Sequence, residues 1–363
     1  MIKRYNDAMA LVAKHGPPDL FLTFTSNPNW PEIQNAIPRH NKKLFRPDIE
    51  ARVFKLKLEE LIKDINERHI FGVVIALIYV IEFQKRGHPH AHMLIFLRDQ
   101  DKPRTAEIVD ALISAELPNP DTDPILFNIV TSSMLHSPCG AINPSAPCMN
   151  EQGRCSKHYP KDFVQETRCE LNQYPVYRRR NNNQTFTKKV FSSAAHSHID
   201  HQFDNRDVVP YNRYLLLKYR AHINLEVCSS IKSVKYLFKY VYKGHDRAHV
   251  EIQDEIKRYI DCRYLSSQEA VWRLMQFEMC YQSHTVYRMH IHLPNRHTVY
   301  FEEGQEEQAV ENNAANEAKS MLLQWFILNQ RDEEARQMLY CEVGTNYVWA
   351  NYTWKRRQVS LEW

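Results

Sequence analysis

The most constraining feature of the chain is the apolar run FGVVIALIYVIEF at residues 71–83. It is rich in β-branched residues and shows no polar alternation, which is typical of a strand buried on both faces of a sheet. Its uninterrupted part, 71–81, is shorter than the roughly 20 residues that a membrane-spanning helix needs. The turn KRGHP follows, and HAHMLIFL then predicts a partner strand. The sequence therefore predicts a buried antiparallel hairpin at the centre of a non-membrane protein.

Helices and further strands are expected on both sides of this hairpin. Apolar residues at helical spacing predict helices over 2–14, 47–67 and 105–116. LFLTFT predicts a strand that ends at the turn-forming SNPNWP. Further along, QEAVWRLMQFEM and the stretch around AKSMLLQWFI are helical in pattern, whereas TVYRMHIHL and TVYFEE alternate as strands do. This mixture of elements indicates an α+β fold.

Composition excludes several classes of protein. The chain has 363 residues and a net charge of +4, which is compatible with a nucleic-acid partner. It contains only 8 glycines and no GxxxxGK[ST] motif, so this sequence does not favour a P-loop NTPase. The first 16 residues lack a signal-peptide core, and the 8 cysteines show no disulfide framework. We therefore expect a reduced, intracellular protein.

Two histidines alternate at the start of the returning strand. Because side chains two apart share one face of a strand, His90 and His92 project together. Their imidazoles can bind a divalent cation if a third ligand faces them. A turn centred near Gly87 would set Gln84 beside His90 and Glu82 beside His92. Such a shell leaves room for a substrate phosphate; the alternative is that the histidines line a solvated sheet edge.

A second candidate site is the segment SVKYLFKYVYKGH. At about 100° per residue, one helix face carries Tyr236, Lys239, Tyr240 and Lys243. A phenol becomes a nucleophile when nearby positive charge stabilises its phenolate, and lysines together with a metal ion can supply that charge. Two tyrosines on adjacent turns would permit two successive transfers. The alternative is a surface stripe of tyrosine and lysine.

Three motifs together resemble those of one family. FLTFTSNPNWPE, EFQKRGHPHAH and KYLFKYVYKG resemble, in the same order, the replication-initiator (Rep) endonuclease region of Helitron transposases. These are eukaryotic rolling-circle elements of the HUH (His-hydrophobe-His) endonuclease superfamily. The resemblance extends over nearly the whole chain, through the stretches HSPCGAINPSAPCMNEQGRCSKHYPKDF, VVPYNRYLLLKYRAHINLEVC and QWFILNQRDEEARQMLYCEV. His88 departs from the pattern, because an apolar residue is expected there.

The resemblance implies an HUH endonuclease-like fold, in which helices flank a central antiparallel sheet of about five strands. Residues 1–134, with the first motif and the histidine strand, and residues 206–253, with the tyrosine helix, would form its two halves. Residues 135–205 would be an irregular Cys-rich insertion. Residues 254–363 would be a C-terminal α+β extension leading to the helicase domain of the family, which is absent from this sequence.

The resemblance also assigns the site residues. His90 and His92 match the family's metal pair, which would bind Mg²⁺ or Mn²⁺, and Gln84 matches the third ligand, with Glu82 as the alternative. The paired nucleophiles and the assisting lysine fall on the tyrosine face, at Tyr236 and Tyr240 and at Lys239 or Lys243. The implied reaction is ATP-independent nicking and strand transfer of single-stranded DNA at transposon ends in the nucleus, through a 5′-phosphotyrosine and a free 3′-hydroxyl.

A third group has the spacing H-x2-C-x8-C-x6-C. Its members are His136, Cys139, Cys148 and Cys155. The spacing is compatible with a structural zinc site, which would stabilise an insertion with little apolar content. His158 or Cys169 could replace one member, and the alternative is a set of unligated cysteines in a reduced loop.

The run YRRR in the same insertion adds positive charge. Arg178, Arg179 and Arg180 can contact DNA phosphates, or they can form a solvated basic loop. Two other functions compete with that of a tyrosine endonuclease. One is a metal-dependent hydrolase that uses the histidine pair to activate water, and the other is a non-catalytic DNA-binding relic.

Overall fold

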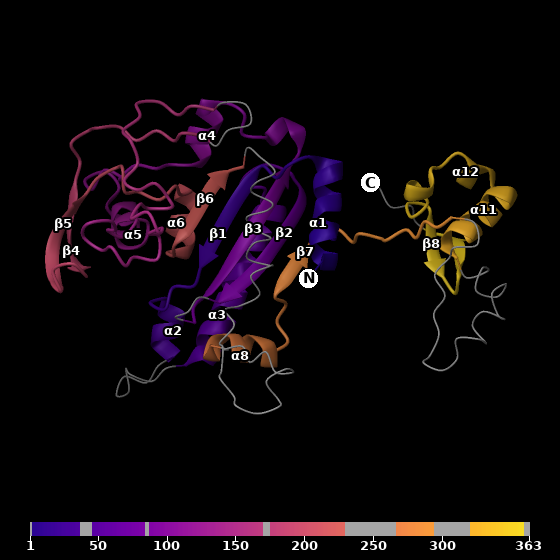
Figure 1. Ribbon diagram of the computed structural model, residues 1–363, viewed down its shortest axis with the longest axis horizontal. Helices are drawn as coiled ribbons and strands as arrows, with labels where there is room; N and C mark the ends of the chain where they lie inside the picture. Colours follow the sequence, from indigo (N-terminus) through magenta and orange to yellow (C-terminus); the bar gives the residue numbers. More distant parts are fainter. Residues whose placement is uncertain are drawn as a thin grey trace. The chain divides into compact units, whose positions relative to one another are not determined.

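Figure 1 shows the computed structural model, which describes residues 2–36, 46–83, 87–169, 175–228, 266–293 and 320–358. The chain divides into two compact units, Met1–His284 and Thr285–Trp363. In the described ranges, no helix is both long enough and apolar enough to cross a bilayer.

Five strands form the main sheet of the first unit: β1 (Leu20–Thr25), β2 (Val74–Phe83), β3 (Pro89–Leu97), β6 (Ile223–Val227) and β7 (Cys280–Gln282). Around the sheet lie the helices α1 (Ile2–His15), α2 (Pro31–Ala36), α3 (Pro47–Asn66), α4 (Ala106–Leu112), α5 (Pro124–Ser133), α6 (Arg213–Tyr219) and α8 (Ser267–Leu274), with a 3-10 turn, η1 (Asp99–Asp101). A separate hairpin is formed by β4 (Phe186–Ser192) and β5 (Ser197–Phe203).

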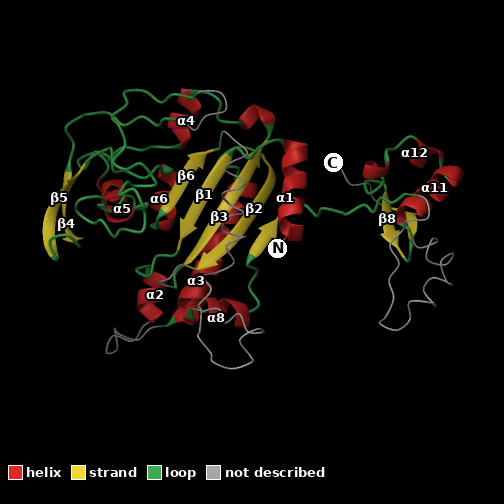
Figure 2. Ribbon diagram, in the orientation of Figure 1, coloured by secondary structure: helices red, strands yellow, loops and turns green. Residues whose placement is uncertain are grey.

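The strand order of the main sheet is β6-β1-β3-β2-β7, and every neighbouring pair is antiparallel (Figure 2). The predicted α+β fold with a five-stranded antiparallel sheet flanked by helices is therefore confirmed. Strand β3 lies at the centre, between β1 and β2, and all nine of its residues are buried. The strand that carries the two histidines is thus the most enclosed part of the sheet.

The two faces of the sheet differ in chemistry, as strand β1 illustrates. Leu20, Leu22 and Phe24 are fully buried in the main hydrophobic core, which they share with α3, α6 and α8. Because side chains alternate along a strand, Thr23 and Thr25 lie on the opposite face. The apolar face fixes the sheet against the helices, and the polar face is left for the candidate site.

The turn before β3 is tied to two helices of the core. Gly87 has a positive φ of +90°, and a Cβ atom there would collide with the side chain of Gln268 in α8. The buried Glu50 carboxylate of α3 accepts hydrogen bonds from Gln268 (3.2 Å) and Ser26 (2.9 Å) and lies 2.6 Å from His88 Nδ1. The polar network therefore fixes where β3 begins.

Several expected elements differ from those observed. The helices predicted over 2–14 and 47–67 are confirmed as α1 and α3. The helix predicted over 105–116 ends at Leu112, because the next residues leave it and Ser114 pairs its backbone with Tyr211. The strand predicted for TVYRMHIHL is wrong, since residues 285–293 have no regular secondary structure. The segment TVYFEE lies outside the described residues.

The predicted C-terminal extension, 254–363, includes elements of both units. Helix α8 packs on α3, and its Trp272 is fully buried against Phe54, with ring centroids 5.9 Å apart. Strand β7 completes the main sheet beside β2.

The second unit contains α11 (Met321–Arg331), α12 (Glu333–Arg336), the 3-10 turn η3 (Tyr340–Glu342) and a hairpin of β8 (Tyr347–Ala350) and β9 (Thr353–Arg356). Among the residues of this unit that the structure describes, Ala335, Val343, Tyr347 and Trp354 form a small buried core.

Candidate functional site

The histidine pair lies on the polar face of the sheet, where β3 pairs with β1. Thr25 stands opposite His90, and Thr23 stands opposite His92. Each threonine Oγ1 lies within hydrogen-bond distance of the Nδ1 atom of its histidine, at 2.9 Å for His90 and 3.1 Å for His92. When Nδ1 donates to the hydroxyl, the lone pair of the ring is left on Nε2. The threonines can therefore orient both imidazoles for metal binding, as partners behind metal-ligating histidines commonly do.

Burial sets the protonation state of His90. Its side chain is enclosed, and Nε2 has no hydrogen-bond partner among the described residues. Desolvation, followed by the nearby ring of His92, lowers the pKa of His90 to about 3. His90 is therefore a neutral imidazole at physiological pH, and a buried polar atom without a partner costs about 1–3 kcal/mol. A cation bound at Nε2 would remove that cost.

The carboxylate of Glu82 completes a set of three donors. The predicted register, with Glu82 beside His92 and Gln84 beside His90, is wrong by two residues. Glu82 pairs with His90 instead, because the turn between β2 and β3 is centred one residue earlier than expected. Its Oε2 atom nevertheless reaches His92 Nε2 diagonally, at 3.0 Å. Gln84 lies outside the described residues.

Other polar residues on the same face enlarge the site. A cavity of about 1000 Å³ is lined by the histidine pair, Glu82 and, from β6 and the residue before it, His222, Asn224 and Glu226. The Nδ1 atom of His222 lies 2.7 Å from the carbonyl of Ser133, to which an Nδ1–H can donate. Burial lowers the pKa of His222, so this ring is also neutral.

Sequence reasoning missed His222, Asn224 and Glu226 as parts of the site, although they alternate with apolar residues in the stretch HINLE. The backbone places them beside the histidines, because Asn224 pairs with Thr23, and Thr25 N donates to the His222 carbonyl at 3.0 Å. The alternation of polar and apolar residues in HINLE indicates a strand, but it does not show that this strand pairs with β1.

The donor set suits a divalent cation. The imidazole nitrogens of His90 and His92 and a carboxylate oxygen of Glu82, with space beside them, are the donor types of an incomplete shell that can accept a phosphate oxygen. His88, which departs from the family pattern, approaches Glu50 and is not part of the cavity lining. The remaining predicted catalytic residues lie outside the described part of the chain: Tyr236, Lys239, Tyr240 and Lys243.

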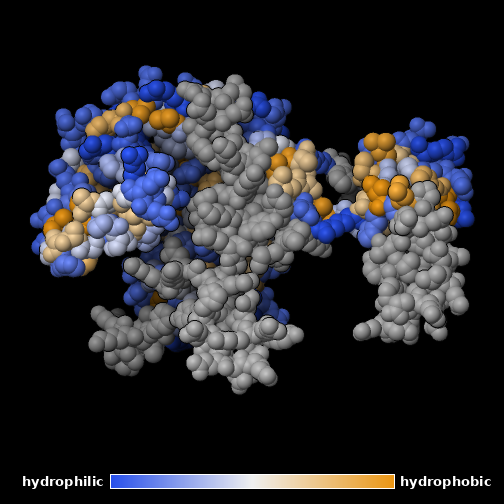
Figure 3. Space-filling model, viewed as in Figure 1, coloured by the Kyte–Doolittle hydropathy of each residue, from blue (hydrophilic) through white to orange (hydrophobic). Residues whose placement is uncertain are grey.

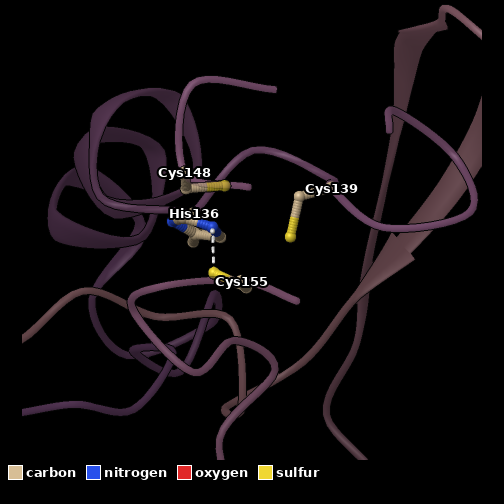
Figure 4. Close-up of side chains that lie close together, drawn as sticks. All are labelled: His136, Cys139, Cys148 and Cys155. Atoms are coloured by element: carbon tan, nitrogen blue, oxygen red, sulfur yellow. Dashed lines mark hydrogen bonds between the residues drawn. The ribbon is translucent and has the colours of Figure 1, made fainter. Parts of the chain in front are cut away.

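The predicted His/Cys3 group does come together (Figure 4). One ligand atom from each of His136, Cys139, Cys148 and Cys155 lies within 4.8 Å of all the others. Cys155 Sγ lies 3.6 Å from His136 Nε2. These separations suit tetrahedral zinc, whose Zn–S bonds are about 2.3 Å long. The cluster can therefore hold a metal such as zinc.

The backbone around this cluster explains its geometry. His136 N donates to the Asp207 carbonyl at 2.8 Å, and Ser156 N donates to the Cys148 carbonyl at 2.7 Å. Burial and the neighbouring thiols raise the pKa of Cys139 to about 12, a cost that a bound cation would reverse. The two alternatives are not members of the cluster, since His158 and exposed Cys169 do not belong to the group of converging ligand atoms.

The three arginines of the run YRRR all contact protein groups. Arg179 is only 4% exposed, and its Nη1 donates to three backbone carbonyls, two of them at 2.6 and 2.7 Å. Arg180 forms a bidentate pair with Glu116. Arg178 lies 2.9 Å from Asp110. The expectation that this run contacts phosphates is therefore not favoured for Arg179, whose burial indicates a structural role.

Comparison with known proteins gives one match. A search of curated proteins found no match to the chain. Residues 1–95 match the family model described as the Helitron helicase-like domain at N-terminus. This range contains the threonine strand β1, the strand β2 and both histidines of β3. Residues 1–95 are therefore similar to a Helitron helicase-like domain, which is consistent with the resemblance to a Helitron Rep-like region.

Proposed function

We propose that the protein is a Helitron-type replication-initiator endonuclease with an HUH-like nuclease fold, which nicks and transfers single-stranded DNA in the nucleus. The observation that carries this proposal is the enclosed histidine pair. His90 and His92 lie on the central strand β3 beside the threonines of β1, and both line a cavity. The Nε2 atom of His90 has no hydrogen-bond partner among the described residues. A purely structural histidine would be expected to have both ring nitrogens satisfied.

The metal site would consist of His90, His92 and Glu82, with Gln84 as the alternative oxygen ligand. An imidazole must be neutral to bind a cation. The low pKa of His90 means that this ring is already neutral and loses no proton when a cation binds. Bound Mg²⁺ or Mn²⁺ would polarise the phosphoryl oxygen of the scissile phosphate and stabilise the charge that develops there. The threonine hydroxyls would keep the rings oriented throughout the reaction.

The chemical step is a transesterification without net hydrolysis. The Oη atom of Tyr236 or Tyr240 forms a bond to the scissile phosphorus as the bond from phosphorus to the 3′ oxygen breaks. The phenolic proton leaves the tyrosine, with Lys239 or Lys243 stabilising the phenolate, and the 3′ oxygen leaves as a hydroxyl. The 5′ end of the DNA is then attached to tyrosine. Attack by a DNA 3′-hydroxyl reverses these bonds and completes strand transfer.

An adduct assay tests the proposal. The full chain is incubated with labelled single-stranded oligonucleotides and Mn²⁺, and covalent products are resolved on denaturing gels. We expect an SDS-resistant adduct that is lost in the Tyr236→Phe, Tyr240→Phe double variant and in His90→Ala. Tyr287→Phe is the matched control, because this tyrosine is 46% exposed and lies in the second unit. Each single tyrosine variant shows which residue acts first.

Every other outcome contradicts the proposal in a specific way. Cleavage without an adduct identifies the water-activating hydrolase. Binding without cleavage identifies the non-catalytic relic. An adduct that persists in the double variant assigns the nucleophile to another residue.

A further inference from the structure

A second cavity lies on the other side of the His/Cys3 cluster. Its volume is about 670 Å³, and its lining includes the cluster residues His136, Cys139 and Cys155. Three residues line both this cavity and the histidine cavity: His136, Ser137 and Tyr159. The two cavities therefore border each other at the cluster, and a polymer bound in one can continue into the other.

The second cavity is richer in basic than in acidic side chains. Its basic members are Arg154, Lys161 and Arg206, with the histidines His136, His158 and His201, and its acidic members are Asp162 and Asp207. Arg206 is already neutralised by Asp204 and stacks on Phe163. Arg154 and Lys161 have no ion-pair partner within the described ranges. Two cations of this cavity are thus available to an anion.

The environment of Lys161 is the strongest indication of an anion site. Its Nζ donates to the Lys157 carbonyl at 2.7 Å and lies 5.0 Å from the centre of the Tyr159 ring. Burial lowers the pKa of Lys161, and the positive charge of Arg179 lowers it further. A half-buried ammonium beside a buried guanidinium is a cost to the fold that a bound anion would reduce.

The second cavity adjoins the β4–β5 hairpin. Figure 3 shows hydrophobic and intermediate residues as well as hydrophilic ones over the region of this hairpin. This hairpin is joined to the cluster loop, because the Ser192 hydroxyl donates to the Ile142 carbonyl at 2.9 Å. His201 and Gln202 of β5 also line the cavity. The cavity is thus lined by residues of the cluster loop and of a β-hairpin, and Arg154, Lys161 and Arg206 are the cationic side chains of its lining.

We propose that the second cavity binds backbone phosphates of the same DNA strand whose scissile phosphate lies in the histidine cavity, with Lys161 and Arg154 as the phosphate ligands. This inference rests on the proposed function. The strand crosses the wall shared by the two cavities, where Tyr159 stacks on His136 with ring centroids 4.2 Å apart. The His/Cys3 cluster then has two roles: it stabilises the insertion, and it fixes the path of the DNA.

The dependence of DNA binding on salt tests this inference. Binding is measured by fluorescence anisotropy in the Tyr236→Phe, Tyr240→Phe background, so that no chemistry intervenes, with oligonucleotides of about 4 and about 16 nucleotides. Each phosphate contact with single-stranded DNA contributes a slope of about −0.7 to the plot of log K against log salt. The Lys161→Ala, Arg154→Ala variant should therefore lose about 1.4 of the slope for the long oligonucleotide. This corresponds to about a tenfold weaker affinity near 0.15 M salt.

Two controls separate this effect from a loss of charge or of fold. The Lys188→Ala, Lys189→Ala variant removes the same charge from exposed positions on β4 and should leave binding within twofold. Lys161→Arg should restore the affinity. The single variant Arg154→Ala changes an exposed side chain, so it keeps the test valid if Lys161→Ala unfolds. The salt slope of this variant should fall by about 0.7.

The short oligonucleotide separates the two cavities, because it can fill the histidine cavity alone. Its affinity should not change in any of these variants. Equal losses for both lengths, or an unchanged slope for the long one, would overturn the inference. A chain that shows the predicted slopes but forms no adduct retains this binding site and refutes the proposed function. If the chain forms the adduct but the salt slope for the long oligonucleotide is unchanged in the variants, the proposed function stands and the phosphate-binding site in the second cavity is refuted.

Discussion

Replacing Thr25 by valine tests the geometry of the histidine pair most directly. The substitution keeps the shape of the side chain but removes the hydroxyl that lies 2.9 Å from His90 Nδ1. Without this partner the ring can place its proton on Nε2 or rotate, and either change removes the metal-binding lone pair. Partners of this kind are typically worth 10- to 100-fold in metal affinity, or about 1.4–2.7 kcal/mol. We expect Thr25→Val to weaken Mn²⁺ binding by at least tenfold in isothermal titration calorimetry.

The matched control is Thr131→Val in α5. Thr131 is 5% exposed, and its hydroxyl donates to the Phe127 carbonyl at 2.8 Å, so the substitution removes one enclosed hydrogen bond without touching the histidines. Both variants should lower the free energy of unfolding by about 1 kcal/mol in urea without metal. Only Thr25→Val should lower metal affinity. If folded Thr25→Val binds Mn²⁺ within twofold of the unmodified chain, the threonine does not orient His90.

Three further predictions concern other parts of the first unit. Asp64→Asn should lower the free energy of unfolding by about 3 kcal/mol at pH 7 in urea titrations, because the enclosed carboxylate accepts from Lys218 at 2.7 Å. Although burial opposes it, hydrogen bonding holds the pKa of Asp64 below 3.8, so this stability is lost as the pH falls below about 4 and the variant should show a shallower acid limb. Cys148→Ser should reduce zinc from one ion per chain to none by atomic absorption, and retained zinc would contradict the assigned cluster. Glu82→Ala should weaken Mn²⁺ binding more than Gln84→Ala does, and the reverse order would make Gln84 the third ligand.

The features that were predictable are those encoded by short, local patterns. The apolar run of β2 and the alternation of His90 and His92 are each contained in about a dozen residues, and so is most of the cysteine spacing. The register of the β2–β3 hairpin was predicted two residues away from the observed one, because it depends on the conformation of a single turn. Strand β7 has only three residues and joins a strand about 200 residues earlier, so no local pattern marks it.

The rest of the site depends on contacts between distant segments. The two threonines are 65 and 69 residues from the histidines that they contact, and β6 lies more than 100 residues beyond both. The burial of Arg179 is another example, since the carbonyls of Ala115, Asn205 and Val208 come from segments that the sequence does not mark as neighbours. From the sequence alone, the basic run 178–180 is therefore predicted to be solvent-exposed, although Arg179 is buried and binds backbone carbonyls.

The pairing of β1 with β3 decides whether the proposed metal site can form. A slip of one residue would turn the buried Leu22 and Phe24 to the polar face, at a cost of about 1.5–3 kcal/mol for each large apolar side chain. The apolar face therefore excludes every register of the wrong parity. A slip of two residues keeps this parity but sets Phe21 opposite His92, and that histidine then loses its threonine.

Only the observed register gives both histidines a hydroxyl partner, and two such hydrogen bonds contribute about 1–3 kcal/mol together. The apolar face thus excludes slips by an odd number of residues, and the two threonine–histidine hydrogen bonds on the polar face select the observed register among those that remain. It follows that the threonine strand is part of the candidate site even if no atom of it touches DNA. It also follows that metal affinity reports on the register of the sheet. A substitution in the core that shifts β1 by two residues should abolish metal binding while leaving the helical content unchanged in circular dichroism.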